Sequence, residues 1–205
     1  MDTAKFKVLI IQQINFINHG EHLKMSKRKG KLVTLQELIS EIDKNVCKFF
    51  FLMRSNDSHL DFDIGLAKTE SSENPVYYVQ YAHARACSII EKCRNEHNQL
   101  YIKIIMNREF KFSEIGNEPE ENELIKTLLT YTDEIKSSAM SLQPHRLTNY
   151  LRKLSSDFHT FYHKFKVLNC ENVALKEDRL ALIDCFRMVT FDALQLLNIS
   201  APEKM

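Results

Sequence analysis

A single stripe of large apolar residues constrains the fold of this chain more than any other feature. The stripe recurs at alternating spacings of four and three residues, at Leu147, Leu151, Leu154, Phe158, Phe161 and Phe165. Such spacing places every member on one face of an α-helix, with polar and basic residues filling the other positions. The stripe therefore predicts a long amphipathic helix with a core packed around it.

Glycine and proline usage points to the same fold class, because each occurs only four times in 205 residues. A strand-rich fold with many tight turns would need more of both. Apolar residues make up 44% of the chain, which is enough for a packed core. We expect a mainly α fold, an antiparallel helical bundle with a small mixed N-terminal part.

Several helix ends are recognisable from their caps. Thr34 and Glu37 form a capping box ahead of an apolar helical period, and Asn74 is a favourable cap for the next long helix. Asn198 is expected to end the last helix in the left-handed conformation. The expected helices lie at about 35–42 and 46–53, then from Pro75, from Pro119 with Leu124, Leu128 and Ile135 on one face, from Pro144, and at about 175–197.

Three segments are harder to assign. Residues 6–17 form an apolar run that fits either a strand or a buried helix. Residues 56–65 are expected to be a loop. Residues 95–118 are polar and irregular, with a short strand or helix at "LYIKIIM".

Charge and cysteine usage limit the classes of function. The formal net charge is +1, so a nucleic acid would have to be bound by local basic patches. Five cysteines without a C-x-x-C pair favour free thiols in a reducing cytoplasm. No apolar run is long enough to span a membrane, and no signal peptide is expected.

The densest basic cluster is the string "KMSKRKG" at residues 24–30. Its lysines lie on a segment whose backbone Gly30 makes more flexible. Such a loop can neutralise charge that grows on phosphates during phosphoryl or adenylyl transfer. A solvated basic loop is the alternative that composition alone favours.

Two possible metal motifs are set aside. His159 and His163 have the i, i+4 spacing of two ligands on a helix, but no third ligand is evident, so we expect two surface histidines and no metal. Asp57, Asp61 and Asp63 lack the glycine and final glutamate of a calcium loop, and are interpreted as caps and loop residues.

Several strings together resemble the arginyl-tRNA synthetases, a family of class I aminoacyl-tRNA synthetases. "KMSKRKG" is similar to the second signature loop of that class, and Asp184-Cys185-Phe186-Arg187 occupies the place of the family's Asp-Ala-Leu-Arg signature. The most specific string is "ENPVYYVQYAHAR" at residues 73–85. The other matching strings are "FFFLMRS" at 49–55, "DSHLDFD" at 57–63 and "SAPEKM" at 200–205, so that the resemblance covers essentially the whole chain.

The resemblance implies three regions and a missing half. Residues 1–33 would be a remnant of the catalytic domain with the lysine loop, 34–72 a helical connector that contacts the tRNA stem, and 73–205 the anticodon-binding bundle. No His-x-Gly-His loop for ATP is found, since "HGEH" at 19–22 has the wrong order. The complete enzyme would use ATP with Mg²⁺ to join arginine to its tRNA. This chain alone is expected to be inactive and to need no cofactor.

The resemblance also implies roles for individual residues. Lys24 and Lys27 would stabilise the pyrophosphate leaving group, and Tyr81, Tyr162 and Met205 would form the anticodon pocket, where unstacked bases pack on side chains. The candidates for phosphate contacts are Arg85, Arg152, Lys153 and Lys166. The alternatives are a core position for Tyr81, a frayed end for Met205 and a solvated helix face for each basic residue.

The expected partners are arginine tRNA and the missing catalytic half, with no membrane and no DNA. Three other hypotheses stay open: a complementing half of a split synthetase, a non-catalytic interaction protein that kept the fold, and, more distantly, a metal-dependent enzyme. The apolar residues Val8, Leu9, Ile10, Ile11 and Ile14 would be exposed without the catalytic half, and would form an adhesive patch.

Overall fold

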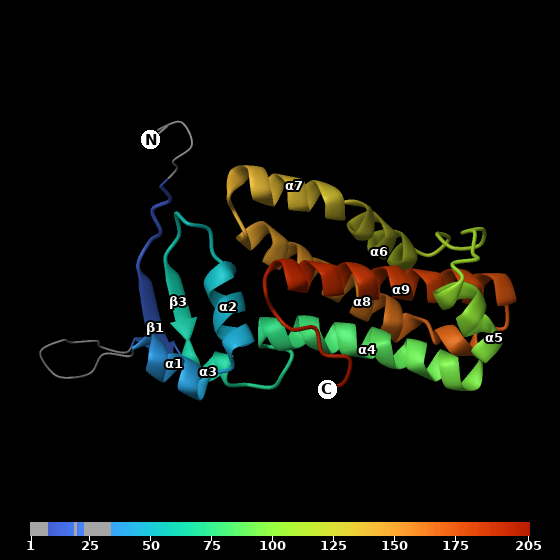
Figure 1. Cartoon of the computed structure of the whole chain (residues 1–205), viewed down its shortest axis with the longest axis horizontal. Coiled ribbons are helices and arrows are strands. Elements are labelled where there is room, and N and C mark those ends of the chain that lie inside the picture. The colour runs from blue at the N-terminus through green and yellow to red at the C-terminus, as the bar shows by residue number, and fades with distance from the viewer. Residues whose placement is uncertain (1–7, 19, 23–33) are drawn as a thin grey trace, which may run out of the picture.

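The computed structural model describes residues 8–18, 20–22 and 34–205. An elongated helical bundle carries a small sheet-containing unit at one end (Figure 1). The bundle consists of α4 (Pro75–Glu96), α5 (Asn98–Tyr101), η3 (Ile102–Met106), α6 (Pro119–Leu129), α7 (Tyr131–Ser141), α8 (His145–Lys164), η4 (Val167–Asn169) and α9 (Val173–Leu196). The end unit consists of β1 (Ile14–Asn18), β2 (Glu21–His22), α1 (Leu35–Glu41), α2 (Lys44–Leu52), β3 (Leu60–Asp63) and α3 (Ile64–Ala67). The predicted mainly α fold is confirmed.

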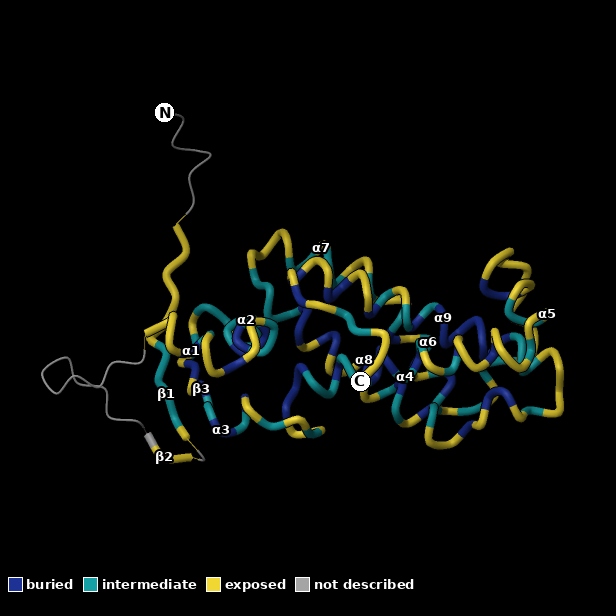
Figure 2. The backbone as a smooth tube through the Cα atoms, turned by 60° about the horizontal axis from the view of Figure 1, so that its bottom comes forward, coloured by how far each residue is buried: buried dark blue, intermediate teal, exposed yellow. Residues whose placement is uncertain are grey.

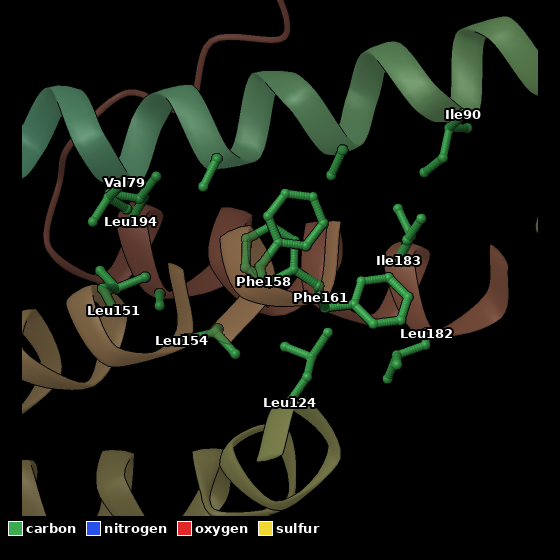
Figure 3. Close-up of a cluster of buried hydrophobic side chains, with 14 of the residues drawn as sticks. Val79, Ile90, Leu124, Leu151, Leu154, Phe158, Phe161, Leu182, Ile183 and Leu194 are labelled. Carbon is green, nitrogen blue, oxygen red and sulfur yellow. The ribbon is translucent and has the colours of Figure 1, made fainter. Parts of the chain in front are cut away.

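Helix α8 lies at the centre of the bundle core. All six residues of its apolar stripe are buried, and the helix packs against α4, α6 and α9. Figure 3 shows Phe158 and Phe161 of α8 surrounded by Val79 of α4, Leu124 of α6 and Ile183 of α9. The Phe158 ring stacks on Phe186 with ring centroids 4.0 Å apart. The stripe thus predicted both the helix and its buried face.

The predicted caps are present where the structure describes them. The Thr34 and Glu37 capping box is formed at α1. Asn74 accepts hydrogen bonds from the backbone N–H groups of Val76 and Tyr77 at the start of α4. Asn198 has φ 55°, the left-handed conformation that ends a helix.

The three-stranded sheet of the end unit has the order β2-β1-β3. Strand β1 pairs in parallel with β3, Phe16 opposite Phe62, and antiparallel with β2. Phe62 is fully buried, with the rings of Phe50 and Phe51 of α2 at 5.2 and 5.3 Å. The predicted loop at 56–65 is therefore wrong in part, because pairing with a strand far away in the sequence orders residues 60–63.

The segment 95–118 is more ordered than its composition indicates. "LYIKIIM" is helical, in α5 and η3, and its residues Ile104 and Ile105 are buried. Beyond η3 the chain has no regular structure up to α6. Asp178 of α9 holds that connection, because its Oδ2 accepts N–H bonds from residues 113, 114 and 115 at 2.9, 2.8 and 3.2 Å.

The helix expected from Pro119 is in fact two helices. Helix α6 ends at Leu129 and α7 begins at Tyr131, so Ile135 does not continue the face of Leu124. Thr130 occupies the break, where its hydroxyl donates to the Thr127 carbonyl at 2.8 Å. A side-chain bond of this kind competes with continuation of the helix.

The N-terminal segment ahead of β1 is exposed, as expected, but Ile14 is not part of this exposed surface, because it lies in β1 and packs on the core of the end unit. Val8, Ile10 and Ile11 are 66%, 81% and 68% exposed, and Figure 2 shows this segment extending away from the rest of the chain. In the part of the chain that the structure describes, no helix is both long and apolar enough to cross a bilayer.

Candidate RNA-binding face

One face of α4 carries a row of aromatic and basic side chains. Tyr77, Tyr81 and Arg85 lie at successive intervals of four residues, and Lys92 follows on the same side. The core-facing side of α4 carries Ala82 and Ala86, both fully buried, which let the neighbouring helices approach closely. The alternation of small and large residues therefore turns the aromatic row away from the core.

Arg85 lies between two tyrosines that come from different helices. Its Nη2 donates a hydrogen bond to the hydroxyl of Tyr81. Its guanidinium carbon is 5.3 Å from the ring centroid of Tyr81 and 5.4 Å from that of Tyr162 on α8. The bond to Tyr81 raises the pKa of Arg85 further, so the group stays charged. The tyrosines thus hold a planar cation in a fixed orientation on the surface.

A cavity of about 500 Å³ opens beside this arginine, between α4 and the C-terminal end of α8. Arg85, Lys92 and Lys166 provide its cations, and Tyr162 and Phe165 its aromatic rings. Ile89, Val167 and Leu168 add apolar surface. None of the described lining residues is acidic. An apolar cavity with cations and no carboxylate suits a group that is both flat and attached to phosphate.

Met205 lines a separate hollow next to the same aromatic row. That cavity, about 670 Å³, also involves Tyr77 and Gln80. The C-terminal tail crosses α4 (Figure 1), where Gln80 donates to the Ser200 carbonyl at 2.8 Å and His83 Nδ1 lies 2.9 Å from the Pro202 carbonyl. Tyr77 stacks on Tyr81 with centroids 6.3 Å apart, so the hollow lies next to the aromatic row, but its lining also includes the carboxylates of Glu41, Asp43 and Glu70, unlike that of the Arg85 cavity.

The other predicted phosphate ligands on α8 lie apart from this cavity. Arg152 is exposed on the helix surface. Lys153 forms an ion pair with Asp157 at 2.9 Å and faces α6. Lys24 and Lys27 lie outside the described residues. Of the basic candidates, the structure therefore brings together Arg85 and Lys166 with Tyr162.

Two residues of the face were not predicted as part of the site. Lys92 continues the helical period of Tyr81 and Arg85, so periodicity could have identified it. His159 was expected at the surface, but it is half-buried, 4.7 Å from Tyr78 and 5.9 Å from Tyr81 by ring centroids. That packing depends on how α4 and α8 meet, which the sequence of either helix does not reveal.

Two histidines that are shielded from solvent, the half-buried His159 and the fully buried His83, should make stability depend on pH. Burial lowers the pKa of both His159 and His83 in the folded chain. Unfolded histidine titrates at about 6.5, so the unfolded state binds more protons as pH falls through that value. The free energy of unfolding should therefore decrease from about pH 7 downwards. Urea unfolding across this range should show less pH dependence in His159→Gln, whereas His59→Gln, which replaces an exposed histidine of the end unit, should match the parent chain. An unchanged dependence in His159→Gln would contradict this.

Comparisons with known proteins identify the family to which the helical bundle belongs. The family model described as "DALR anticodon binding domain" matches residues 79–205. The chain therefore belongs to the DALR anticodon-binding domain family.

The relatives that it resembles are arginine–tRNA ligases. That of Desulforamulus reducens is 41% identical over 199 residues, covering 97% of this chain and 34% of the relative. That of Geobacillus kaustophilus is 41% identical over 204 residues, covering 100% and 36%. The chain thus spans about a third of the length of these relatives.

Solved structures agree in fold. The putative arginyl-tRNA synthetase from Campylobacter jejuni superimposes with a TM-score of 0.83 at 25% identity, over 100% of this chain and 42% of that one. The Thermus thermophilus arginyl-tRNA synthetase has a TM-score of 0.68 at 22% identity, over 93% of this chain and 34% of that one. The resemblance inferred from the sequence strings is confirmed.

Proposed function

We propose that this chain binds the anticodon arm of arginine tRNA, as the C-terminal part of an arginine–tRNA ligase. The observation that carries the proposal is the cation held between Tyr81 and Tyr162 at the rim of a cavity without carboxylates. Unpaired bases of RNA loops bind by stacking on aromatic rings and guanidinium planes, and phosphates bind to nearby lysines and arginines. Membership of an anticodon-binding family supports the same ligand.

Each residue of the face has a distinct part in this proposal. Tyr81, Tyr162 and Met205 provide surfaces on which unpaired bases stack, and Arg85 fixes the orientation of both tyrosines. Lys166 and Lys92 neutralise the phosphates that accompany those bases, and the exposed pair of Lys92 with Glu96, at 3.7 Å, would open for this contact. Arg152 is exposed on α8 and would contact the stem, whereas Lys153 is already engaged by Asp157. We also propose that the chain divides into three regions at residues 33 and 72, and that the ligase acts in the cytoplasm.

The test is binding of a stem-loop with the arginine tRNA anticodon, compared with the same stem-loop carrying a changed central anticodon base. We expect a preference of more than tenfold for the unchanged loop at physiological salt, because base contacts rather than charge discriminate. Tyr162→Ala should abolish the preference. Tyr101→Ala is a matched control, since Tyr101 also has an arginine over its ring, Arg94 at 5.8 Å, at the other end of α4. Equal, steeply salt-dependent binding of both loops would refute specific anticodon recognition.

Aminoacylation itself is proposed only for the complete ligase. ATP and Mg²⁺ would be bound there by the nucleotide-binding part. Among the described residues, no group of three or more His, Cys, Asp or Glu side chains gathers as metal ligands. In that complete ligase, we propose that Lys24 and Lys27 would stabilise the pyrophosphate leaving group.

The exposed N-terminal segment favours a second candidate, a chain that complements a catalytic part. Ile10 and Ile11 extend from β1 into solvent, although isoleucine is among the residues most often buried. We propose that the nucleotide-binding part of the ligase covers them. Continuous apolar surface of this kind typically marks an interface.

Mixing this chain with a ligase fragment that ends before it should therefore restore arginine incorporation into tRNA. Lys27→Ala should lower the restored rate without weakening association, whereas Ile10→Glu should prevent association. Leu129→Glu is the control, because Leu129 is equally exposed, at 76%, but lies on α6. No incorporation in any mixture would exclude this candidate.

A further inference from the structure

A second cavity lies on the other side of α8, between that helix and α6 and α7. Its volume is about 520 Å³. Its lining includes Thr127 of α6, Glu134 of α7, and His145, Arg146, Tyr150 and Lys153 of α8. It is separate from the cavity beside Arg85, with which it shares no lining residue.

Unsatisfied hydrogen-bonding groups are concentrated at this cavity. Six buried side-chain nitrogen or oxygen atoms lack a partner among the described residues, and three of them belong to its lining: His145 Nδ1, Arg146 Nε and the Tyr150 hydroxyl. Tyr150 is only 6% exposed. A buried polar atom without a partner is destabilising, and these three atoms belong to side chains that line one cavity, so a ligand there that moved the groups covering them would supply the missing bonds.

The charges around the cavity are already balanced. Arg146 pairs with Glu134 at 3.0 Å, Lys153 with Asp157 at 2.9 Å, and Lys126 with Glu123 at 2.9 Å. A free anion would meet these carboxylates, and a free cation would meet the lysines and the arginine. The lining therefore fits an uncharged ligand that presents both donors and acceptors.

The unsatisfied groups specify which atoms such a ligand must present. Arg146 Nε can only donate. Burial raises the pKa of Tyr150, and Glu134 and Asp157 raise it further, so the hydroxyl keeps its proton and can donate as well. The ligand needs at least two neighbouring acceptor atoms, with donors elsewhere on its edge that carboxylates can accept.

We propose that this cavity binds an unpaired nucleobase, with guanine the best match. Guanine presents O6 and N7 as adjacent acceptors for arginine-like donors, and its N1 and N2 donors suit Glu134 and Glu123. The inference rests on the proposed function, because the base would come from the RNA held on the α4–α8 face. Tyr150 and Tyr162 are twelve residues apart on α8, about 18 Å along its axis, and the exposed side chains between them include Arg152, Lys153 and Ser156.

The test uses free nucleosides, so that it does not depend on the stem-loop. Guanosine added to the ¹⁵N-labelled chain should shift the amide signals of Thr127, Asn149 and Tyr150, and cytidine should shift them less. Tyr150→Phe, which removes only the unpartnered hydroxyl, should weaken guanosine binding about five- to tenfold, as expected for one lost hydrogen bond. Thr190→Val is the matched control, since it removes a buried unpartnered hydroxyl on α9, away from this cavity.

Three results would overturn the inference. No shift with guanosine would mean that ordered water alone satisfies these groups. Shifts with inorganic phosphate but not with guanosine would mean an anion site. Guanosine shifts that Tyr150→Phe leaves unchanged would place the ligand elsewhere. In each case stem-loop binding that depends on Tyr162 would leave the proposed function intact, whereas loss of stem-loop binding alone would refute only that function.

Discussion

Replacing Glu121 by alanine is expected to destabilise the folded chain by about 3–5 kcal/mol, the range found when one partner of a buried ion pair is removed. The side chains of Glu121 and Arg179 are 1% and 10% exposed, and Arg179 Nε donates to Glu121 Oε1 at 2.8 Å. Alanine would leave the Arg179 cation buried against Phe165, 3.9 Å from its ring centroid, without an anion. The other carboxylate oxygen also accepts the Gly116 N–H at 3.0 Å, so the connection before α6 loses an anchor too.

A double variant separates the charge from the packing. Replacing Glu121 by leucine together with Arg179 by methionine removes both charges and keeps the volume, so much of the lost stability should return. Urea unfolding monitored by circular dichroism measures both variants. Glu123→Ala, which breaks an exposed pair with Lys126 on the same helix, should have little effect. If Glu121→Ala and the double variant were equally destabilised, the buried charge would not be the cause.

The local part of the fold could be predicted from the sequence because its signals are local. The α8 stripe, the Thr34 capping box and the left-handed Asn198 each depend on residues within a few turns of one another. Strand β3 could not be predicted, since its partner β1 lies 46 residues away at the Asn15–Asp61 pair. The same holds for the connection that Asp178 anchors across more than 60 residues.

The candidate site divides in the same way. Lys92 follows from the period of α4, and the pairing of Lys153 with Asp157 follows from their i, i+4 spacing. Both were available in the sequence. The position of Arg85 between two tyrosines could not be predicted, because Tyr162 contacts it from another helix. The burial of His159 against Tyr78 could not be predicted either, for the same reason. Residue types could indicate RNA binding, whereas the arrangement of the site depends on how α4 and α8 pack.

Arg85→Lys is expected to weaken stem-loop binding about tenfold or more, even though it keeps the charge. The guanidinium of Arg85 contacts the rings of Tyr81 and Tyr162 and donates to the Tyr81 hydroxyl. Lysine has a compact ammonium that cannot stack, so both rings would lose the cation that orients them. Because the number of cations is unchanged, the salt dependence of the affinity should stay the same.

Lys166→Ala should behave in the opposite way. Removing one phosphate contact should weaken every stem-loop alike and lower the slope of log affinity against log salt by about 0.7.

Arg94→Lys is the control for Arg85→Lys, because Arg94 also lies over a tyrosine ring, Tyr101, at the far end of α4. Titrations at several salt concentrations distinguish the two roles. If Arg85→Lys bound as tightly as the parent chain, Arg85 would act only as a point charge, and the paired tyrosines would not need it to present their rings to RNA.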